Sequence, residues 1–370
     1  MLKCIYLSFM IPFYDIKRVI APYREQLKQV AAEVIEGGQY IRGERVKAFE
    51  ASFAQQLGVP YCLGVGNGYD ALKLVLKSWI NLGKLKKGDK VAIPSNTFIA
   101  TALAVKEVGL ELVLVTADPK THLIDLQSLE KELRRDDVQA VIVVHLFGQL
   151  VDMKKLQLLA EKYEVEVLED AAQAHGASFD GQKAGTFGFP AAFSFYPAKN
   201  LGALGDAGAI VSDDEMLMQH VRKLANYGSG QKYQHELEGV NSRMDELQAA
   251  FLSVRLPFLE REVKERRAIA AYYLEHINHP KIQLPKIENH GHAWHLFVIR
   301  TERRDDLMKY MKENGVECLI HYPVDLRNNA LFGENKVADT VADQILSLPL
   351  FPKMEAWEMH KVVALLNAYQ

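Results

Sequence analysis

The chain has 370 residues, of which 49% are hydrophobic and 25% charged, a balance typical of a globular protein long enough for two domains. This composition excludes a disordered or fibrous protein. Lys and Arg number 44 against 47 Asp and Glu, so the net charge is −3 and the chain lacks the basic surplus of a nucleic-acid-binding protein. We therefore expect small-molecule partners and no nucleic acid.

Cysteine usage and hydropathy indicate the compartment. Cys4, Cys62 and Cys318 are too few for a disulfide framework and are not spaced like zinc ligands, which favours a reducing compartment and predicts a cytoplasmic protein. Tyr6 and Ser8 interrupt the apolar N-terminal run, and no small-residue cleavage pattern follows, so we expect no signal peptide. No stretch approaches the roughly 20 uninterrupted apolar residues of a membrane span, so no membrane partner is expected.

Short β-rich runs predict the strands of a sheet. They cover residues 62–66, 91–94, 110–115, 140–147, 165–170, 191–196 and 207–212. Amphipathic stretches of helical length lie between several of them, at residues 69–80, 99–108, 153–163 and 213–226. This alternation predicts an α/β fold, a parallel sheet covered by helices. The last two runs have only a short connection, so we expect them to pair antiparallel or to cross the sheet through the loop that holds the chemistry.

A long charged amphipathic segment at residues 242–277 follows, and Pro257 should break or kink it. We interpret this segment as a connector between domains. One strand-like run and two helices follow it, at residues 294–300, 305–314 and 355–369. The predicted organisation is an N-terminal extension, a large domain that begins with a helical segment, and a small C-terminal α+β domain, at residues 1–13, 14–255 and 256–370.

The first motif with chemical meaning is the lysine loop at residues 194–208. Lys199 follows an apolar strand and precedes Gly202, Gly205 and Gly208, whose backbone permits close approach to a ligand. An amine held in this way suits Schiff-base chemistry. Most lysines are instead solvated loop residues, so the assignment depends on neighbouring motifs.

The second motif is a pair of acids, Glu169 and Asp170, at the C-terminal end of an apolar strand. Ligands in open α/β sheets bind at that end. A carboxylate there can pair with the protonated ring nitrogen of pyridoxal phosphate (PLP), which lets the ring act as an electron sink. The structural alternative for Asp170 is a helix N-cap.

The third motif is the glycine-rich turn Gly64-Val-Gly66-Asn67-Gly68 between a strand and a helix. Free amides at a helix N-terminus form an anion site suited to a phosphate. A dinucleotide fold is the alternative, but its G-x-G-x-x-G motif needs glycine where Tyr69 stands, and G-x-x-x-x-G-K-[ST] is absent. A plain Asn-Gly turn without function also remains open.

Together, these motifs resemble the fold-type I PLP-dependent aminotransferases, and more closely the DegT/DnrJ/EryC1/StrS family of nucleotide-sugar aminotransferases. The resemblance extends from about residue 11 to the C-terminus and is carried by residues 66–68, 94–101, 144–148, 169–176, 194–199, 208–209 and 239–250. It implies a large domain with a seven-stranded, mostly parallel sheet and a small C-terminal α+β domain.

The resemblance implies that Lys199 forms an imine with PLP and later moves protons, while Asp170 pairs with the ring nitrogen. The other implied cofactor-binding residues are Gln173 beside the ring hydroxyl, Phe98 over the ring face, Gly66, Asn67, Gly68 and Ser194 around the phosphate, and Asn241 from a neighbouring subunit. It therefore implies a homodimer with shared active sites. An aromatic residue in the position of Phe98 is more often part of a core.

Three residues near the lysine motif or in the C-terminal part resemble the sugar-binding residues of members that aminate the third carbon of a dTDP-linked sugar. They are Tyr196, His321 and Tyr322, for which packing roles are the alternative. The diphosphate needs a cation, and Arg243 is the nearest one in the motifs.

The predicted function is transfer of an amino group from glutamate to a dTDP-linked 3-keto-6-deoxyhexose in deoxyamino-sugar biosynthesis. A 4-keto nucleotide sugar is the alternative substrate. A non-catalytic regulator of the same fold would lack Lys199, and a dinucleotide-dependent oxidoreductase is disfavoured by the broken glycine motif. We expect no metal site at His290, His292 and His295, because no Cys or acid is spaced to complete it, and His295 is expected to begin a strand.

Overall fold

The computed structural model describes residues 10–135, 137–231, 233–287, 290–332 and 341–370. Positions 1–9 of the predicted N-terminal extension, including Cys4, lie outside the described residues. Within the rest of that segment, Ile11 is buried and its amide donates to the Gly315 carbonyl oxygen at 2.9 Å. This contact places the start of the described chain against the C-terminal part.

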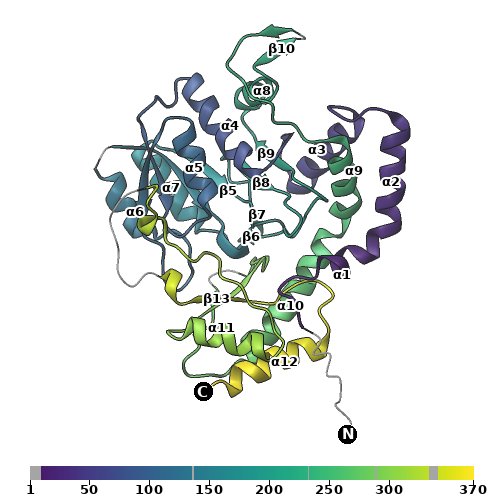
Figure 1. Cartoon of the computed structure of the whole chain (residues 1–370). Coiled ribbons are helices and arrows are strands. Elements are labelled where there is room, and N and C mark those ends of the chain that lie inside the picture. Colours follow the sequence, from purple (N-terminus) through teal and green to yellow (C-terminus); the bar gives the residue numbers. More distant parts are fainter. Residues whose placement is uncertain (1–9, 136, 232, 288–289, 333–340) are drawn as a thin grey trace.

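A seven-stranded sheet lies at the centre of the larger part of the molecule (Figure 1). Its strands are β1 (Tyr61–Val65), β2 (Lys90–Pro94), β3 (Glu111–Val115), β4 (Val138–Val144), β5 (Glu166–Asp170), β8 (Ala191–Ser194) and β9 (Gly208–Ser212), in the spatial order β1-β9-β8-β5-β4-β2-β3. Pairing is parallel from β3 through β2, β4 and β5 to β8, whereas β9 runs antiparallel to both β8 and β1. The α/β prediction and the antiparallel pairing of the last two strands are confirmed.

Helices cover both faces of this sheet (Figure 1). One face packs against α4 (Gly68–Asn81), α5 (Ile99–Glu107) and α8 (Glu215–Leu224). The other packs against α3 (Glu44–Leu57), α6 (Leu126–Leu133), α7 (Met153–Tyr163) and α9 (Glu246–Arg255). Successive strand side chains point to opposite faces, so Val91 and Ile93 belong to the first core and Ala92 to the second.

Side-chain caps explain where several of these helices begin. Asn67, Asp125, Asp152 and Asp214 each accept a hydrogen bond from the backbone amide three residues further along, at the N-termini of α4, α6, α7 and α8. Such caps satisfy amides that have no partner within the helix.

The N-terminal helical segment consists of α1 (Ile16–Ile20), the short 3-10 turn η1 (Ala21–Tyr23), α2 (Arg24–Gly37) and α3. The last two of these pack against α9. The buried carboxylate of Glu246 joins α9 to the start of α3, because it accepts from the amides of Gly43 and Val46 at 2.6 and 3.1 Å.

Pro257 interrupts the long connector segment, as predicted. It lies in the 3-10 turn η3 (Leu256–Phe258), which separates α9 from α10 (Leu259–His276). The start of α10 contributes Val263 to the core beneath the sheet, and its end contributes Tyr273 to a separate C-terminal core. This helix therefore packs in both parts of the molecule.

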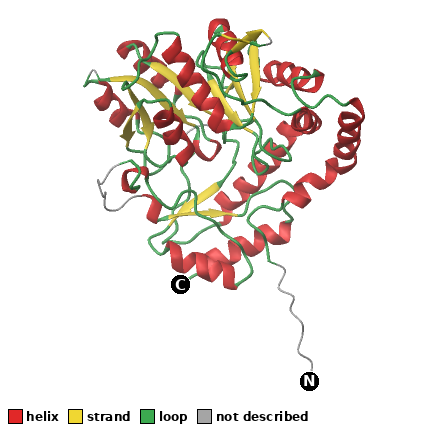
Figure 2. Ribbon diagram, turned by 45° about the horizontal axis from the view of Figure 1, so that its top comes forward, coloured by secondary structure: helices red, strands yellow, loops and turns green. Residues whose placement is uncertain are grey.

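The C-terminal part combines β12 (Phe297–Arg300), β13 (Ile345–Leu348), α11 (Arg304–Glu313) and α12 (Ala356–Ala368) (Figure 2). The two strands pair antiparallel, and the predicted strand and both predicted helices are confirmed. The sequence analysis missed β13. Its four residues form a short apolar run, which periodicity alone does not distinguish from a buried helix segment.

Smaller elements complete the fold. Two short hairpins pair β6 (Ser178–Phe179) with β7 (Gln182–Lys183) and β10 (Ser229–Gln231) with β11 (Gln234–His235), and 3-10 turns occur at η2 (Leu146–Gly148), η4 (Leu326–Asn328) and η5 (Val341–Asp343). The β10–β11 hairpin stands out from the body at the top of Figure 1. The predicted strand at 140–147 ends earlier, because the chain turns after Val144 into η2, where Phe147 has a φ of 60°.

Candidate active site

A cavity of about 390 Å³ opens at the carboxyl edge of the parallel strands. Asp170 at the end of β5, Lys199 in the loop after β8 and Asn67 at the start of α4 line it together. The C-terminal part contributes His321 and Tyr322. The structure thus brings the three sequence motifs to one place, although they are far apart in the chain.

Close backbone packing shapes the lysine loop. The Lys199 amide donates to the Tyr196 carbonyl oxygen at 2.8 Å, which closes a tight turn. A Cβ atom at Gly202 would lie 2.3 Å from the Pro197 carbonyl oxygen, so only glycine fits there. The Lys199 amine reaches the cavity, and burial lowers its pKa from 10.5 to about 8, against the opposing charge of Asp170. A fraction of this amine is therefore neutral and nucleophilic near neutral pH.

Asp170 is buried, and both of its carboxylate oxygens accept hydrogen bonds. Oδ2 accepts from Thr101 Oγ1 at 2.9 Å and Oδ1 accepts from the Ala172 amide at 3.2 Å. Burial raises the pKa of this carboxyl, while these two donors and the charge of Lys199 oppose the rise. Asp170 does not cap a helix: it ends β5 and lines the cavity.

The glycine-rich turn and Ser194 form a narrow concave site at the N-terminus of α4, which we call the cup and which consists of Asn67, Gly68 and Ser194. Asn67, Gly68 and Ser194 all line the cavity, and a Cβ atom at Gly68 would lie 2.7 Å from Ser194 Cβ. Gly66 lies behind the cup, because its amide donates to Ser242 Oγ at 3.0 Å and it does not line the cavity.

The residues predicted around a cofactor ring also meet here. Phe98 is 50% exposed and lines the cavity, so it is not a core residue, and its ring centroid lies 5.0 Å from that of Tyr322. Gln173 accepts from the Phe147 amide at 2.6 Å and donates through Nε2 to the Tyr322 hydroxyl at 3.0 Å. Gln173 therefore joins the sheet edge to the C-terminal part across the cavity.

The three residues predicted to contact a sugar share this cavity. Tyr196 is 55% exposed at its mouth, and His321 lies 2.9 Å from Ser347 Oγ through Nδ1. Burial and the charge of Lys199 lower the pKa of His321 from 6.5 to about 4, so this imidazole is neutral near neutral pH. Burial raises the pKa of Tyr322, so its hydroxyl keeps its proton.

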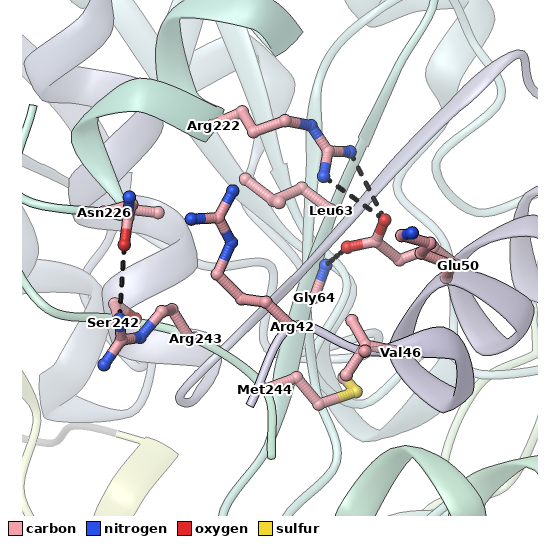
Figure 3. A pocket seen from close by; sticks show the side chains of 13 residues that line it. Arg42, Val46, Glu50, Leu63, Gly64, Arg222, Asn226, Ser242, Arg243 and Met244 are labelled. Atoms are coloured by element: carbon pink, nitrogen blue, oxygen red, sulfur yellow. Dashed lines mark hydrogen bonds and ion pairs between the residues drawn. The ribbon is translucent and has the colours of Figure 1, made fainter. Parts of the chain in front are cut away.

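Arg243 and Asn241 do not lie in the Lys199 cavity of the same chain. Arg243 lines a second pocket with Arg42, Arg222 and Glu50 (Figure 3). Its Nη1 donates to Asn226 Oδ1 at 3.2 Å, while Arg222 contacts Glu50 Oε2 at 3.3 Å.

Asn241 is exposed and pairs through its backbone with Asn226. Ser242 lies between Asn241 and Arg243 and donates to Asp70 Oδ2 at 2.7 Å. The segment therefore lies against the outer side of the glycine-rich turn.

The sequence analysis assigned no site role to Thr97, Thr101 or His295, of which Thr97 and His295 line the cavity. Thr97 lies two residues before α5 and Thr101 lies in its first turn, and their hydroxyl oxygens are 2.9 Å apart. The four-residue spacing that places both hydroxyls on one side is a readable signal. His295 was expected to begin a strand, but β12 begins at Phe297 and His295 lines the cavity, where its Nδ1 lies 3.3 Å from Asn200 Oδ1. No local pattern signals His295, because its position depends on packing between distant segments.

Within the described ranges, no group of three or more His, Cys, Asp or Glu side chains is arranged to hold a metal ion. None of the helices in those ranges has the length and apolar character needed to span a bilayer.

Comparison with known proteins identifies the family. The model of the DegT/DnrJ/EryC1/StrS aminotransferase family matches residues 22–367. The dTDP-3-amino-3,6-dideoxy-alpha-D-galactopyranose transaminase of Aneurinibacillus thermoaerophilus is 43% identical over 366 residues, which cover 97% of this chain and 99% of that protein.

Solved structures agree with this match. The structure of S. venezuelae DesV in complex with a ketimine intermediate has a TM-score of 0.94 at 38% identity and covers 98% of this chain and 99% of its own. NtdA from Bacillus subtilis, solved with its bound cofactor PMP, has a TM-score of 0.88 at 29% identity over 97% of this chain and 84% of its own. The resemblance seen in the sequence is confirmed: this chain belongs to the DegT/DnrJ/EryC1/StrS family of PLP-dependent sugar aminotransferases.

Proposed function

We propose that this protein transfers an amino group from glutamate to a dTDP-linked 3-keto-6-deoxyhexose. The observation that carries the proposal is one cavity in which Lys199 and the buried Asp170 lie with Tyr196, His321 and Tyr322. The A. thermoaerophilus relative is named as a transaminase of a dTDP-3-amino sugar, which favours the third carbon over the fourth.

The cavity residues fit PLP. Gly68 begins α4, whose first amides have no partner within the helix, and Ser194 lies directly against it, so this narrow cup suits a phosphate. Asp170 presents a buried carboxylate for the ring nitrogen, and Phe98 presents a flat side chain for the ring face. When bound, PLP supplies an electron-poor ring that accepts the electron pair of a broken C–H bond.

Lys199 has two roles in this proposal. With a pKa of about 8, its amine is available both to attach the cofactor and, once released, to take up and deliver a proton. Asp170 holds a proton at the ring nitrogen, because a carboxylate in a buried site stabilises a neighbouring positive charge. These roles require the side chains of Lys199 and Asp170 to reach the cavity, and both side chains line it.

Discrimination between keto positions needs polar groups that pair with the sugar's hydroxyls, since a mismatched isomer leaves them unpaired. The Tyr322 hydroxyl accepts from Gln173 and keeps its own proton for donation. His321 is neutral and anchored to Ser347, so it can hydrogen-bond an uncharged hydroxyl. The Tyr196 phenol adds a third polar group, at the mouth of the cavity.

A second copy of the chain would complete the site. Asn241 is exposed, and two exposed apolar side chains contact residues close to it in the chain: Ile41 is bridged to Asp245, and the Tyr227 ring lies against Arg243. Such a surface suits a two-fold interface. In this arrangement Asn241 of one subunit reaches the phosphate of the other, and Arg243 supplies a cation for the substrate diphosphate. Both roles belong to the proposal.

The proposal includes a cytoplasmic location. Cys62 and Cys318 are buried and form no disulfide, as suits a reducing compartment.

The test is amino transfer by the purified protein with PLP, glutamate and either the 3-keto or the 4-keto isomer of a dTDP-6-deoxyhexose. We expect 2-oxoglutarate and an aminated sugar nucleotide, identified by mass spectrometry, with the 3-keto isomer. Tyr196→Phe and His321→Asn should lower kcat/KM for the sugar about tenfold each and leave the visible absorption of bound PLP unchanged.

Lys199→Ala should abolish turnover, whereas Lys154→Ala, which changes an exposed lysine paired with Asp180, should not. Efficient amination of the 4-keto isomer alone would overturn the substrate assignment. Wild-type turnover by Lys199→Ala would overturn the mechanism.

A further inference from the structure

Two buried threonine hydroxyls stand behind Asp170. Thr97 is 1% exposed and Thr101 is not exposed at all. Thr101 Oγ1 lies 2.9 Å from Asp170 Oδ2 and also 2.9 Å from Thr97 Oγ1. The two hydroxyls and the carboxylate thus form a row that begins at the cavity wall and ends on Asp170.

Proton counting gives this row a direction. A threonine hydroxyl carries one proton, and an ionised carboxylate can only accept. If Asp170 is ionised, the Thr101 proton points to Asp170, and the Thr101 oxygen must accept the proton of Thr97. Both hydroxyl dipoles then point their positive ends toward the carboxylate, and each bond strengthens the next.

The neighbouring acid has different partners. Glu169 Oε2 lies 2.9 Å from His145 Nε2 and accepts from the Gly185 amide at 2.8 Å. The other donor to Asp170 in the described part of the chain is the Ala172 amide, at the longer distance of 3.2 Å. Thr101 is therefore the side chain that orients Asp170 Oδ2.

We propose that Thr101 is a positioning residue for Asp170, and that Thr97 reinforces it through the shared hydrogen bond. The row holds the carboxylate ionised and turned so that it keeps the ring nitrogen of PLP protonated. This inference rests on the proposed function, because it concerns how the same cavity tunes its cofactor. The protonation state of the PLP ring nitrogen does not depend on the sugar, so it can be measured without a substrate.

The test compares Thr101→Val, which removes the hydroxyl and keeps the shape, with Thr101→Ser, which keeps the hydroxyl. We measure the ¹⁵N chemical shift of bound PLP labelled at the ring nitrogen, the Kd for PLP, and kcat. Thr101→Val should move the shift toward the unprotonated value and lower kcat about tenfold to a hundredfold, the effect of losing a hydrogen bond to a charged group.

Thr101→Ser should restore the shift and most of the rate. Thr97→Val should change the ¹⁵N shift and kcat in the same direction as Thr101→Val, by a smaller factor. Thr301→Val is the matched control, because it makes the same change at a buried threonine of the C-terminal part and should leave the shift unchanged.

A wild-type ¹⁵N shift and wild-type kcat in folded Thr101→Val would overturn the proposal. If Thr101→Val does not fold, a wild-type ¹⁵N shift and wild-type kcat in Thr97→Val would overturn the proposal that the row of hydroxyls positions Asp170. Failure of the wild-type protein to bind PLP would instead count against the proposed function, whereas amination of another keto sugar would leave the role of Thr101 intact.

Discussion

Gly208 offers a sharp test of the cavity's geometry. It lies in β9, where a Cβ atom would stand 2.4 Å from the carbonyl carbon and 2.5 Å from the oxygen of Asn67, and 2.8 Å from the Gly68 amide nitrogen. These atoms are backbone, at the cup that we assign to the phosphate. Ordinary contacts of a Cβ atom begin near 3.4 Å, so the strand and the cup must separate by about 1 Å to admit a methyl group.

Gly208→Ala should therefore destabilise the apoprotein by about 1–3 kcal/mol, the usual cost of overpacking. If the same energy is lost from cofactor binding, the Kd for PLP rises about fivefold to 160-fold. Urea unfolding of the apoprotein measures the first quantity and absorbance titration with PLP measures the second.

The matched control is Gly37→Ala in α2, where a Cβ atom meets nothing within 4 Å. Removal of a helical glycine should stabilise the protein by about 0.5–1 kcal/mol and leave the PLP Kd unchanged. Wild-type stability and PLP affinity in Gly208→Ala would refute the assignment of a rigid cup between β9 and α4.

Three further outcomes are expected. Asp170→Asn should lower kcat about tenfold to a hundredfold or more in a folded protein, measured as 2-oxoglutarate release, and a normal rate would refute its charge-holding role. Inactive Lys199→Ala and Asn241→Asp proteins, refolded together, should regain activity in mixed dimers, whereas no recovery, or a monomer by sedimentation, would refute a shared site. Burial and the charge of Arg300 lower the pKa of His122 from 6.5 to about 4, so the unfolded chain takes up a proton there first as the pH falls. Stability should drop by about 3 kcal/mol between pH 6.5 and 4 from this residue alone, and His122→Asn, which suits the φ of 62°, should flatten the urea-unfolding curve in that window.

The residues to which we assign the chemistry could be read from the sequence because their signals are local. Lys199 is marked by the turn and glycines around it, Asp170 by the end of an apolar strand, and Asn67 with Gly68 by the start of a helix. In a parallel sheet these positions meet at one edge, so the topology turned separate motifs into one site. The family resemblance added Phe98, which a local reading assigned to a core.

Other parts of the site depend on contacts that no local pattern encodes. Thr101 meets Asp170 across 69 residues of sequence, and His295 reaches the cavity only because the segment before β12 packs beside Asn200. Arg243, the cation that we predict for the substrate diphosphate, lines a pocket with Arg42 and Arg222 within its own chain, a neighbourhood that no local pattern indicates.

The amino-acid sequence by itself determined the sheet, the helices that cover it and the identity of the residues at the strand ends, since hydrophobic periodicity and turn chemistry act over a few residues. Only the tertiary structure decided which side chains share a cavity and which donors satisfy Asp170. The physical reason is that burial is a property of the packed chain rather than of any segment. Burial lowers the pKa of Lys199, and it makes each buried polar atom depend on a partner that is distant in the sequence.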